Sequence, residues 1–280
     1  MQVASGKRQG AGCKLACREA PLRGQPLRLA ICLLFLAAFS LSACAASTQP
    51  VVKIGFVAPF EGRYRTIGYE AIYAARLAIR EINTQGGIHG WRVELVAVDD
   101  GGEADKALMA ARQLALDPQV AAVVGHYRPD STAAALPVYC AAGLPVIAIE
   151  STSRACTDTL NIGSAPRERW GEEGTLFVSN VPDPNGLPST EDFVARYNAI
   201  PIDGTRAGPI ALQTYDVFLL LFEAFARAQK IDRGEVQAAL RQIDFAGLGA
   251  TYAFDPQGQL INPQSYVFDY DEERQPHLLP

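Results

Sequence analysis

Two clusters of hydroxyl side chains follow apolar runs in the middle of the sequence, where they could hydrogen-bond a small polar ligand. Ser131 and Thr132 follow the run 120–124, and residues 151–153 (Ser-Thr-Ser) follow the run 146–149. The order strand, loop, helix, strand predicts a parallel sheet, and small ligands bind beyond the carboxyl ends of such strands. The two clusters are therefore predicted to form two sides of one binding site. Simple N-capping of a helix is the alternative explanation for the first cluster.

The elements around these clusters predict an α/β fold. Residues 51–58 and 92–98 are predicted strands, separated by a helix whose apolar residues recur at helical spacing and which ends at Gly86-Gly87. A second helix begins near residue 104 and stops at Asp117-Pro118. After Thr157 the alternation ends, and residues 158–175 show no convincing strand or helix.

The C-terminal part is predicted to be helical first and extended afterwards. One helix runs from Ser189 to about Asn198, and another from Pro209 to Ala228 is apolar on most faces and should be buried. A third begins at Asp232, where Glu235 completes a capping box. Residues 251–254 and 266–270 are interpreted as an antiparallel pair of strands around a turn.

The first 43 residues have the pattern of an export signal. They carry six basic residues and one acidic residue, with an apolar core over residues 29–42. This core is shorter than the ~20 residues of a membrane-spanning helix. The sequence Leu-Ser-Ala-Cys ending at Cys44 resembles the lipobox of bacterial lipoproteins, which implies a lipidated Cys44 and a tether over residues 44–50. An ordinary cleaved signal peptide is the alternative.

The remaining chain is acidic. Without residues 1–43 it carries 19 basic and 29 acidic residues, a formal net charge of −10. Such a body repels phosphate backbones, so no nucleic acid partner is expected. Cys140 and Cys156 are the two cysteines beyond the leader, and either a disulfide between them or two free thiols fits the sequence.

The motifs of common enzyme classes are absent. Neither GxGxxG, a P-loop, HExxH, CxxC nor GxSxG occurs, and the chain has three histidines. His126 is interpreted as a hydrogen-bonded loop residue, with ligand or metal binding as the alternative. The dipole of the following helix explains the acidic turn at Asp99 and Asp100. No enzyme activity, cofactor or metal is expected.

The order and spacing of several segments resemble the first lobe of periplasmic binding proteins for leucine, isoleucine and valine. The resemblance rests on KIGFVAPFEG, EINTQGGIHG, VELVAVDDGGE, AAVVGHYRPDST and GLPVIAIESTS, and near the C-terminus on TYDVFLLLFEAFARA and ATYAFDPQGQL. It implies a periplasmic binding protein type I-like α/β fold. It also implies an extracytoplasmic receptor for an amino acid, branched-chain or related, with the permease subunits of an ABC importer as partners and the membrane reached through the lipid anchor.

The resemblance also assigns the binding residues. In the family, hydroxyls and amides of the loops after the third and fourth strands hold the ligand carboxylate. This role is carried over to Tyr127, Ser131, Thr132, Ser151 and Thr152. Glu150 stands where the family has a small residue, and its carboxylate would repel a ligand carboxylate unless it pairs or protonates.

The chain departs from the family in length. Sixteen residues separate Thr157 from Gly174, where the family has most of its second lobe, so ~100 residues are missing. The expected result is one nearly complete parallel-sheet lobe from residues 51–157 and 189–250. Residues 158–188 and 251–280 would form the crossover and a remnant of the second lobe. A single-lobe sensor or scaffold, or a relic of the family that binds nothing, is the alternative to solute capture.

Overall fold

A five-stranded parallel sheet is the centre of the fold. The computed structural model describes residues 49–151, 159–163, 177–185, 187–201, 206–270 and 276–279. The strands follow the order β2-β1-β3-β4-β5, and all neighbours are parallel. They comprise β1 (Val51–Ala58), β2 (Arg92–Asp99), β3 (Val120–Val124), β4 (Val146–Ala148) and β5 (Thr159–Asn161). The predicted parallel sheet is confirmed.

Strand β5 corrects one prediction, because residues 158–175 were expected to hold neither strand nor helix. Thr159, Leu160 and Asn161 pair with β4 and are buried. A three-residue strand with polar residues at both ends gives no periodic signal in the sequence. Burial against β4 and a bond from Asn161 Nδ2 to the Ser151 carbonyl, 2.9 Å, hold it in place.

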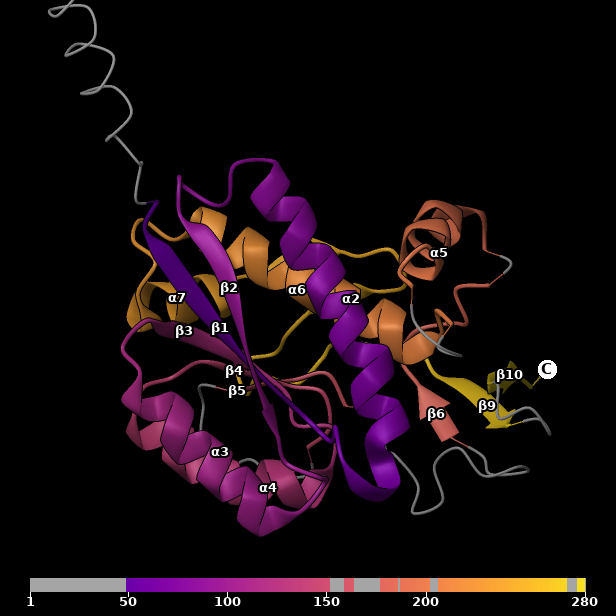
Figure 1. The fold of residues 1–280 in the computed structure, drawn as a ribbon, viewed down its shortest axis with the longest axis horizontal. Helices are drawn as coiled ribbons and strands as arrows, with labels where there is room; N and C mark the ends of the chain where they lie inside the picture. Colours follow the sequence, from indigo (N-terminus) through magenta and orange to yellow (C-terminus); the bar gives the residue numbers. More distant parts are fainter. Residues whose placement is uncertain are drawn as a thin grey trace, which may run out of the picture. The chain divides into compact units, whose positions relative to one another are not determined.

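Helices cover both faces of the sheet (Figure 1). Helices α2 (Arg65–Thr84) and α6 (Pro209–Arg227) lie on one face, where they share one large apolar core with the sheet. Helices α3 (Ala104–Leu116) and α4 (Pro129–Ala141) cover the other face over a second core. Short 3-10 turns at Gly62–Tyr64 and Pro188–Thr190 precede α2 and α5 (Glu191–Asn198).

Both cores are built from residues 52–252. Residues 49–280 form one compact unit with its own core, as expected of a part that folds by itself. Within the described residues one helix, α6, is long and apolar enough to cross a membrane, but 83% of its most apolar stretch is buried inside the fold. Its apolarity is explained by packing, as the sequence predicted.

Helix α7 (Arg233–Leu240) ties the C-terminal part of the chain to the amino end of the sheet. Asp232 caps it by accepting the Glu235 amide at 3.0 Å, as predicted from the capping box. Arg233 Nε donates to the Val120 carbonyl at 3.0 Å. Its other nitrogens donate to carbonyls at the ends of α3 and α4, those of Ala115, Asp117 and Ala142. A cation at these helix ends also meets the negative pole of each dipole.

Two small antiparallel sheets complete the described chain. Strand β7 (Asp244–Ala246) pairs with β8 (Thr251–Ala253), whereas β9 (Tyr266–Tyr270) lies between β6 (Phe177–Ser179) and β10 (Pro276–Leu278). The predicted pairing of residues 251–254 with 266–270 is therefore wrong. The turn at residues 255–258 closes on itself instead, since Phe254 bridges Leu260 and Gln259 bridges Asn161 of the main sheet.

Two carboxyl groups join α6 to its neighbours. Glu70 of α2 accepts the Ala211 amide at 2.9 Å in the first turn of α6, and burial raises its pKa to about 7. Asp216 of α6 accepts the amides of Leu248 and Gly249, each at 2.8 Å, and burial raises its pKa to about 6. Both groups therefore bind a proton more tightly in the folded chain than in the unfolded one.

This difference predicts that stability falls as pH rises. Between the ordinary pKa of 4.5 and about 7 for Glu70, the folded state holds more protons than the unfolded state, so the free energy of unfolding decreases with pH. Together with Asp216 the loss should amount to several kcal/mol, at ~1.4 kcal/mol for each pKa unit, measured by urea unfolding at a series of pH values. Glu70→Gln should flatten the profile, while Glu191→Gln, which removes an exposed carboxyl on α5, should leave it unchanged. An unaltered profile in Glu70→Gln would contradict the assignment.

Candidate functional site

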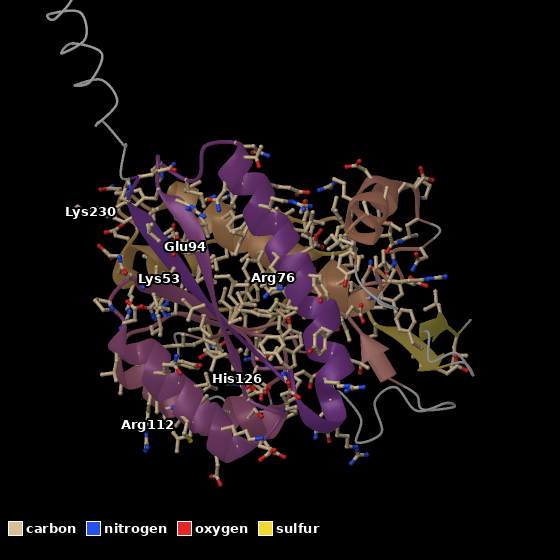
Figure 2. The ribbon with its side chains drawn as sticks, in the orientation of Figure 1. Lys53, Arg76, Glu94, Arg112, His126 and Lys230 are labelled. Carbon is tan, nitrogen blue, oxygen red and sulfur yellow. The ribbon has the colours of Figure 1, made fainter. Side chains whose placement is uncertain are left out.

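The parallel register brings the carboxyl ends of the strands to one edge of the sheet. Ala58 lies opposite Asp99, Phe56 opposite Val124, and Ala148 opposite Asn161. The loops that follow these strands must therefore meet at this edge, where ligands of open α/β sheets bind. Figure 2 shows His126 of the loop after β3 at this edge, at the opposite end of the sheet from Lys53 and Glu94.

Asp99 fastens the loop after β1 to the loop after β2. Its Oδ1 accepts the amides of Phe60 at 2.7 Å, Glu61 at 3.2 Å and Gly101 at 3.0 Å. Three amide bonds to one carboxylate oxygen fix the path of the chain as it leaves β1. The dipole of α3 alone does not explain this acidic turn.

A buried polar chain joins the loops after β2 and β3 to helix α4. Asp100 and His126 are fully buried, and Asp100 Oδ2 lies 2.6 Å from His126 Nδ1. His126 Nε2 lies 3.2 Å from the hydroxyl of Tyr139, whose pKa is raised by burial, so that the phenol keeps its proton. Asp100 Oδ1 accepts the Gly102 amide at 2.8 Å. The interpretation of His126 as a hydrogen-bonded loop residue is confirmed.

Two of the predicted ligand-binding hydroxyls are bonded inside the protein. The Tyr127 hydroxyl lies 2.7 Å from Thr214 Oγ1 of α6, and burial raises the Tyr127 pKa, which keeps the phenol neutral. Thr132 Oγ1 donates to the Glu150 carbonyl and lies 3.0 Å from the Arg128 carbonyl. Both side chains hold the loop after β3 in position, against α6 and against the end of β4.

Ser131 differs from them. It is fully buried in the first turn of α4, and its Oγ has no hydrogen-bond partner in the described chain. The amides of Asp130 and Ser131 belong to the same turn, where an α-helix leaves its amides without intrahelical partners. Hydroxyl, amides and helix dipole together favour an acceptor or an anion at this point.

Arg128 supplies a cation beside this turn. Its Nε is also buried without a partner, and its guanidinium carbon lies 4.4 Å from the centre of the Tyr64 ring. Gly102 has φ +72°, and a Cβ there would lie 2.7 Å from Tyr64 Cδ2 and 3.2 Å from Arg128 Cγ. The loops after β1, β2 and β3 therefore pack closely around Arg128. Sequence reasoning missed this residue, since a single arginine in a loop carries no pattern.

The second predicted side of the site is partly described. Ser151 is half-buried at the end of β4, and its carbonyl accepts Asn161 Nδ2. Glu150 is buried, and its amide donates to the His126 carbonyl at 3.1 Å. Thr152, the other predicted residue of this loop, and Cys44 of the proposed anchor lie outside the described residues.

Potential metal ligands and the cysteines were the remaining candidates for chemistry. The described part of the chain has no group of three or more His, Cys, Asp or Glu residues placed to hold a metal ion. Cys140 is disulfide-bonded, which resolves the choice between thiol and disulfide for this residue. Cys156, its expected partner, lies outside the described residues.

Comparison with known proteins shows what the first part of the folded chain resembles. Residues 51–164 match the family model described as periplasmic binding protein. Over 126 residues, 45% of this chain, an amino acid binding protein of Pseudomonas aeruginosa is 33% identical, and a Leu/Ile/Val-binding protein homolog of Brucella melitensis is 31% identical. The match spans 34% and 31% of these proteins, so the chain covers about a third of the length of the curated relatives it matches.

Solved structures show the fold. A substrate-binding protein of an ABC transporter from Desulfitobacterium hafniense, in complex with Leu, superposes with a TM-score of 0.68 at 18% identity. The superposition covers 81% of this chain and 99% of that protein. Residues 51–164 are therefore similar to periplasmic binding proteins, among them Leu/Ile/Val-binding relatives, and the described chain has the type I α/β fold of these substrate-binding proteins.

Proposed function

We propose that this protein captures a small carboxylate, an amino acid of the branched-chain type or a related compound, and delivers it to an ABC importer. The observation that carries the proposal is the buried hydroxyl of Ser131 at the N-terminus of α4, for which the described part of the chain supplies no hydrogen-bond partner. A buried polar atom without a partner costs free energy. A ligand oxygen that accepts its hydrogen bond removes this cost.

The proposed ligand contacts follow from the hydrogen-bond donors that each side chain does not use inside the protein. Ser131 and the first amides of α4 would receive the ligand carboxylate, and Arg128 stands beside them as a donor and counter-charge. Tyr127 and Thr132 hold the loop through Thr214 and the Glu150 carbonyl, so we propose that they shape the site. Ser151 and Thr152 are proposed to close it from the other side.

A site on a single lobe, which the length of the chain predicts, would have limited affinity. Ligand contacts that stay in water are worth only ~1 kcal/mol per hydrogen bond, whereas a closed cleft excludes water and gains more. Apart from the main sheet, the described chain holds only the small sheets β10-β9-β6 and β7-β8. This observation favours the second candidate, a single-lobe sensor or scaffold, if no ligand is captured.

Export and membrane attachment complete the proposal. Residues 1–43 have the basic and apolar pattern of an export signal, and the sequence ending at Cys44 resembles a lipobox. Both support a lipoprotein on the extracytoplasmic side of the membrane. The match to the periplasmic binding protein model supports the same location. Since the family consists of binding proteins, we propose no catalytic role for the polar chain of Asp100, His126 and Tyr139.

Ligand binding is tested by thermal unfolding of residues 45–280 with leucine, isoleucine, valine, acidic amino acids and aromatic carboxylates at millimolar concentration. A site filled at a hundred times its dissociation constant adds ~2.7 kcal/mol, a shift of a few degrees in Tm. Ser131→Ala should abolish the shift without lowering the Tm of the free protein, because the deleted hydroxyl has no hydrogen-bond partner among the described residues.

Thr132→Val is the matched control. It removes a hydroxyl that donates to the Glu150 carbonyl, so it should lower the Tm of the free protein through a loss of ~1 kcal/mol. A ligand shift that survives Ser131→Ala would remove Ser131 from the site. A cooperative transition that no ligand moves would favour the sensor or relic function.

The proposed anchor is tested separately in bacterial cells fed a clickable fatty acid. The full chain should incorporate the label and sediment with membranes, and Cys44→Ala should lose the label. Cys140→Ala, which removes a cysteine of the folded domain, should keep it. Labelling that persists in Cys44→Ala would refute the assignment of Cys44.

A further inference from the structure

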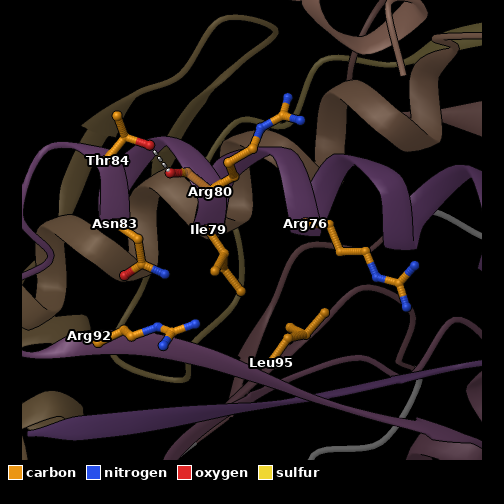
Figure 3. Close-up of a pocket in the computed structure, with 7 residues that line it drawn as sticks. All are labelled: Arg76, Ile79, Arg80, Asn83, Thr84, Arg92 and Leu95. Atoms are coloured by element: carbon orange, nitrogen blue, oxygen red, sulfur yellow. Dashed lines mark hydrogen bonds between the residues drawn. The ribbon is translucent and has the colours of Figure 1, made fainter. Parts of the chain in front are cut away.

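An open pocket lies away from the candidate ligand site, between helix α2 and the edge strand β2. Its volume is about 440 Å³. Figure 3 shows Arg76 and Arg92 reaching into the space between helix and strand, while Arg80 extends upward from the helix. The lining residues are Arg76, Ile79, Arg80, Asn83, Thr84, Arg92 and Leu95.

The pocket concentrates positive charge on an acidic protein. Its three arginines are exposed, and none of them forms an ion pair with the described residues, whose ion pairs all involve other side chains. The seven lining residues include no acid; Glu94 lies two positions along β2 from Arg92. Guanidinium groups match phosphate oxygens in geometry and charge. The pocket therefore suits a phosphate-bearing anion.

The frame of the pocket is fixed by the fold. Asn83 joins α2 to β2 through two hydrogen bonds. Its Nδ2 donates to the Val93 carbonyl at 2.8 Å, and its Oδ1 accepts the Val93 amide at 2.9 Å. The last turn of α2 holds no basic residue, and the helix dipole acts mainly over that turn. The dipole therefore does not account for Arg76 and Arg80.

The chain enters the sheet beside this pocket. The Arg92 amide donates to the Pro50 carbonyl at 2.8 Å, and Gln49 Nε2 donates to the Gly86 carbonyl at 3.0 Å, just after α2 ends. Gln49 lies five positions after Cys44, and a fully extended chain of five residues reaches ~18 Å. A lipid on Cys44 would hold this side of the domain within that distance of the membrane surface.

We propose that the pocket of Arg76, Arg80 and Arg92 is a docking site for the phosphate headgroups of anionic phospholipids. The proposal rests on the lipid anchor proposed above for its geometry. Each arginine near an anionic surface adds to membrane attraction, and a short tether keeps the arginines within range of the surface potential. The domain would then turn toward the membrane the edge of the sheet at which its strands begin. The opposite, carboxyl edge with Ser131 would face away from it.

The test measures sedimentation of residues 49–280, without the anchor, with phosphatidylcholine vesicles that contain or lack phosphatidylglycerol. Binding should require phosphatidylglycerol and weaken with salt. Arg76→Gln with Arg92→Gln should lower the association constant about tenfold or more. Arg112→Gln with Arg206→Gln removes the same charge from two exposed arginines that do not line the pocket, and should change binding less than about twofold.

Several outcomes would overturn the proposal. Equal losses in the two double variants would mean that net charge alone drives the binding. Equal binding to both vesicle types, or to neither, would exclude anionic headgroups as the occupant. Calorimetric binding of inorganic phosphate without any vesicle preference would assign the pocket to a free anion. Because vesicle binding by residues 49–280 needs neither lipidation nor an amino acid, its failure is separable from failure of the proposed function.

Discussion

The contact between Asp100 and His126 is the constraint on which the site depends. The two side chains meet at 2.6 Å without access to solvent, and a buried polar group is tolerated only while its bonds are made. Asp100 also accepts a hydrogen bond from the Gly102 amide, and the second ring nitrogen of His126 is hydrogen-bonded with the Tyr139 hydroxyl. The loops after β2 and β3 and helix α4 can therefore settle only in positions that satisfy all four partners together, and that choice places Ser131.

Further hydrogen bonds around this contact determine which polar groups remain available to a ligand. Tyr127 is held by Thr214 and Thr132 by the Glu150 carbonyl, so these hydroxyls serve the architecture. Ser131 and Arg128 keep unused donors within the same loop. In the loop after β3 the fold thus divides three hydroxyls into two that hold the loop, those of Tyr127 and Thr132, and that of Ser131, which has no partner among the described residues.

Sequence reasoning predicted the strands and helices whose positions depend on hydrophobic periodicity and on local helix capping. Apolar runs revealed β1 and β3, a proline marked the start of α6, and Asp232 with Glu235 marked α7. Strand β5 was missed because three residues cannot display a period. The partner of β8 was assigned wrongly because pairing depends on where the turn at residues 255–258 closes, which is a tertiary matter. Whether a hydroxyl finds an acceptor also depends on residues distant in sequence, since Thr132 and Glu150 are eighteen positions apart. The division into lobes and the ligand contacts stay predictions.

Arg233 has a consequence for how this chain could change in evolution. With Glu70 and Tyr127 it fastens the segment after residue 206 to the sheet formed before residue 164, by bonds that span from about ninety to 141 positions. These bonds join the two segments directly. Loop entropy grows only with the logarithm of length, so a connection between the two segments could lengthen or shorten at small cost to their packing. A fold held in this way tolerates a change of length between its two segments.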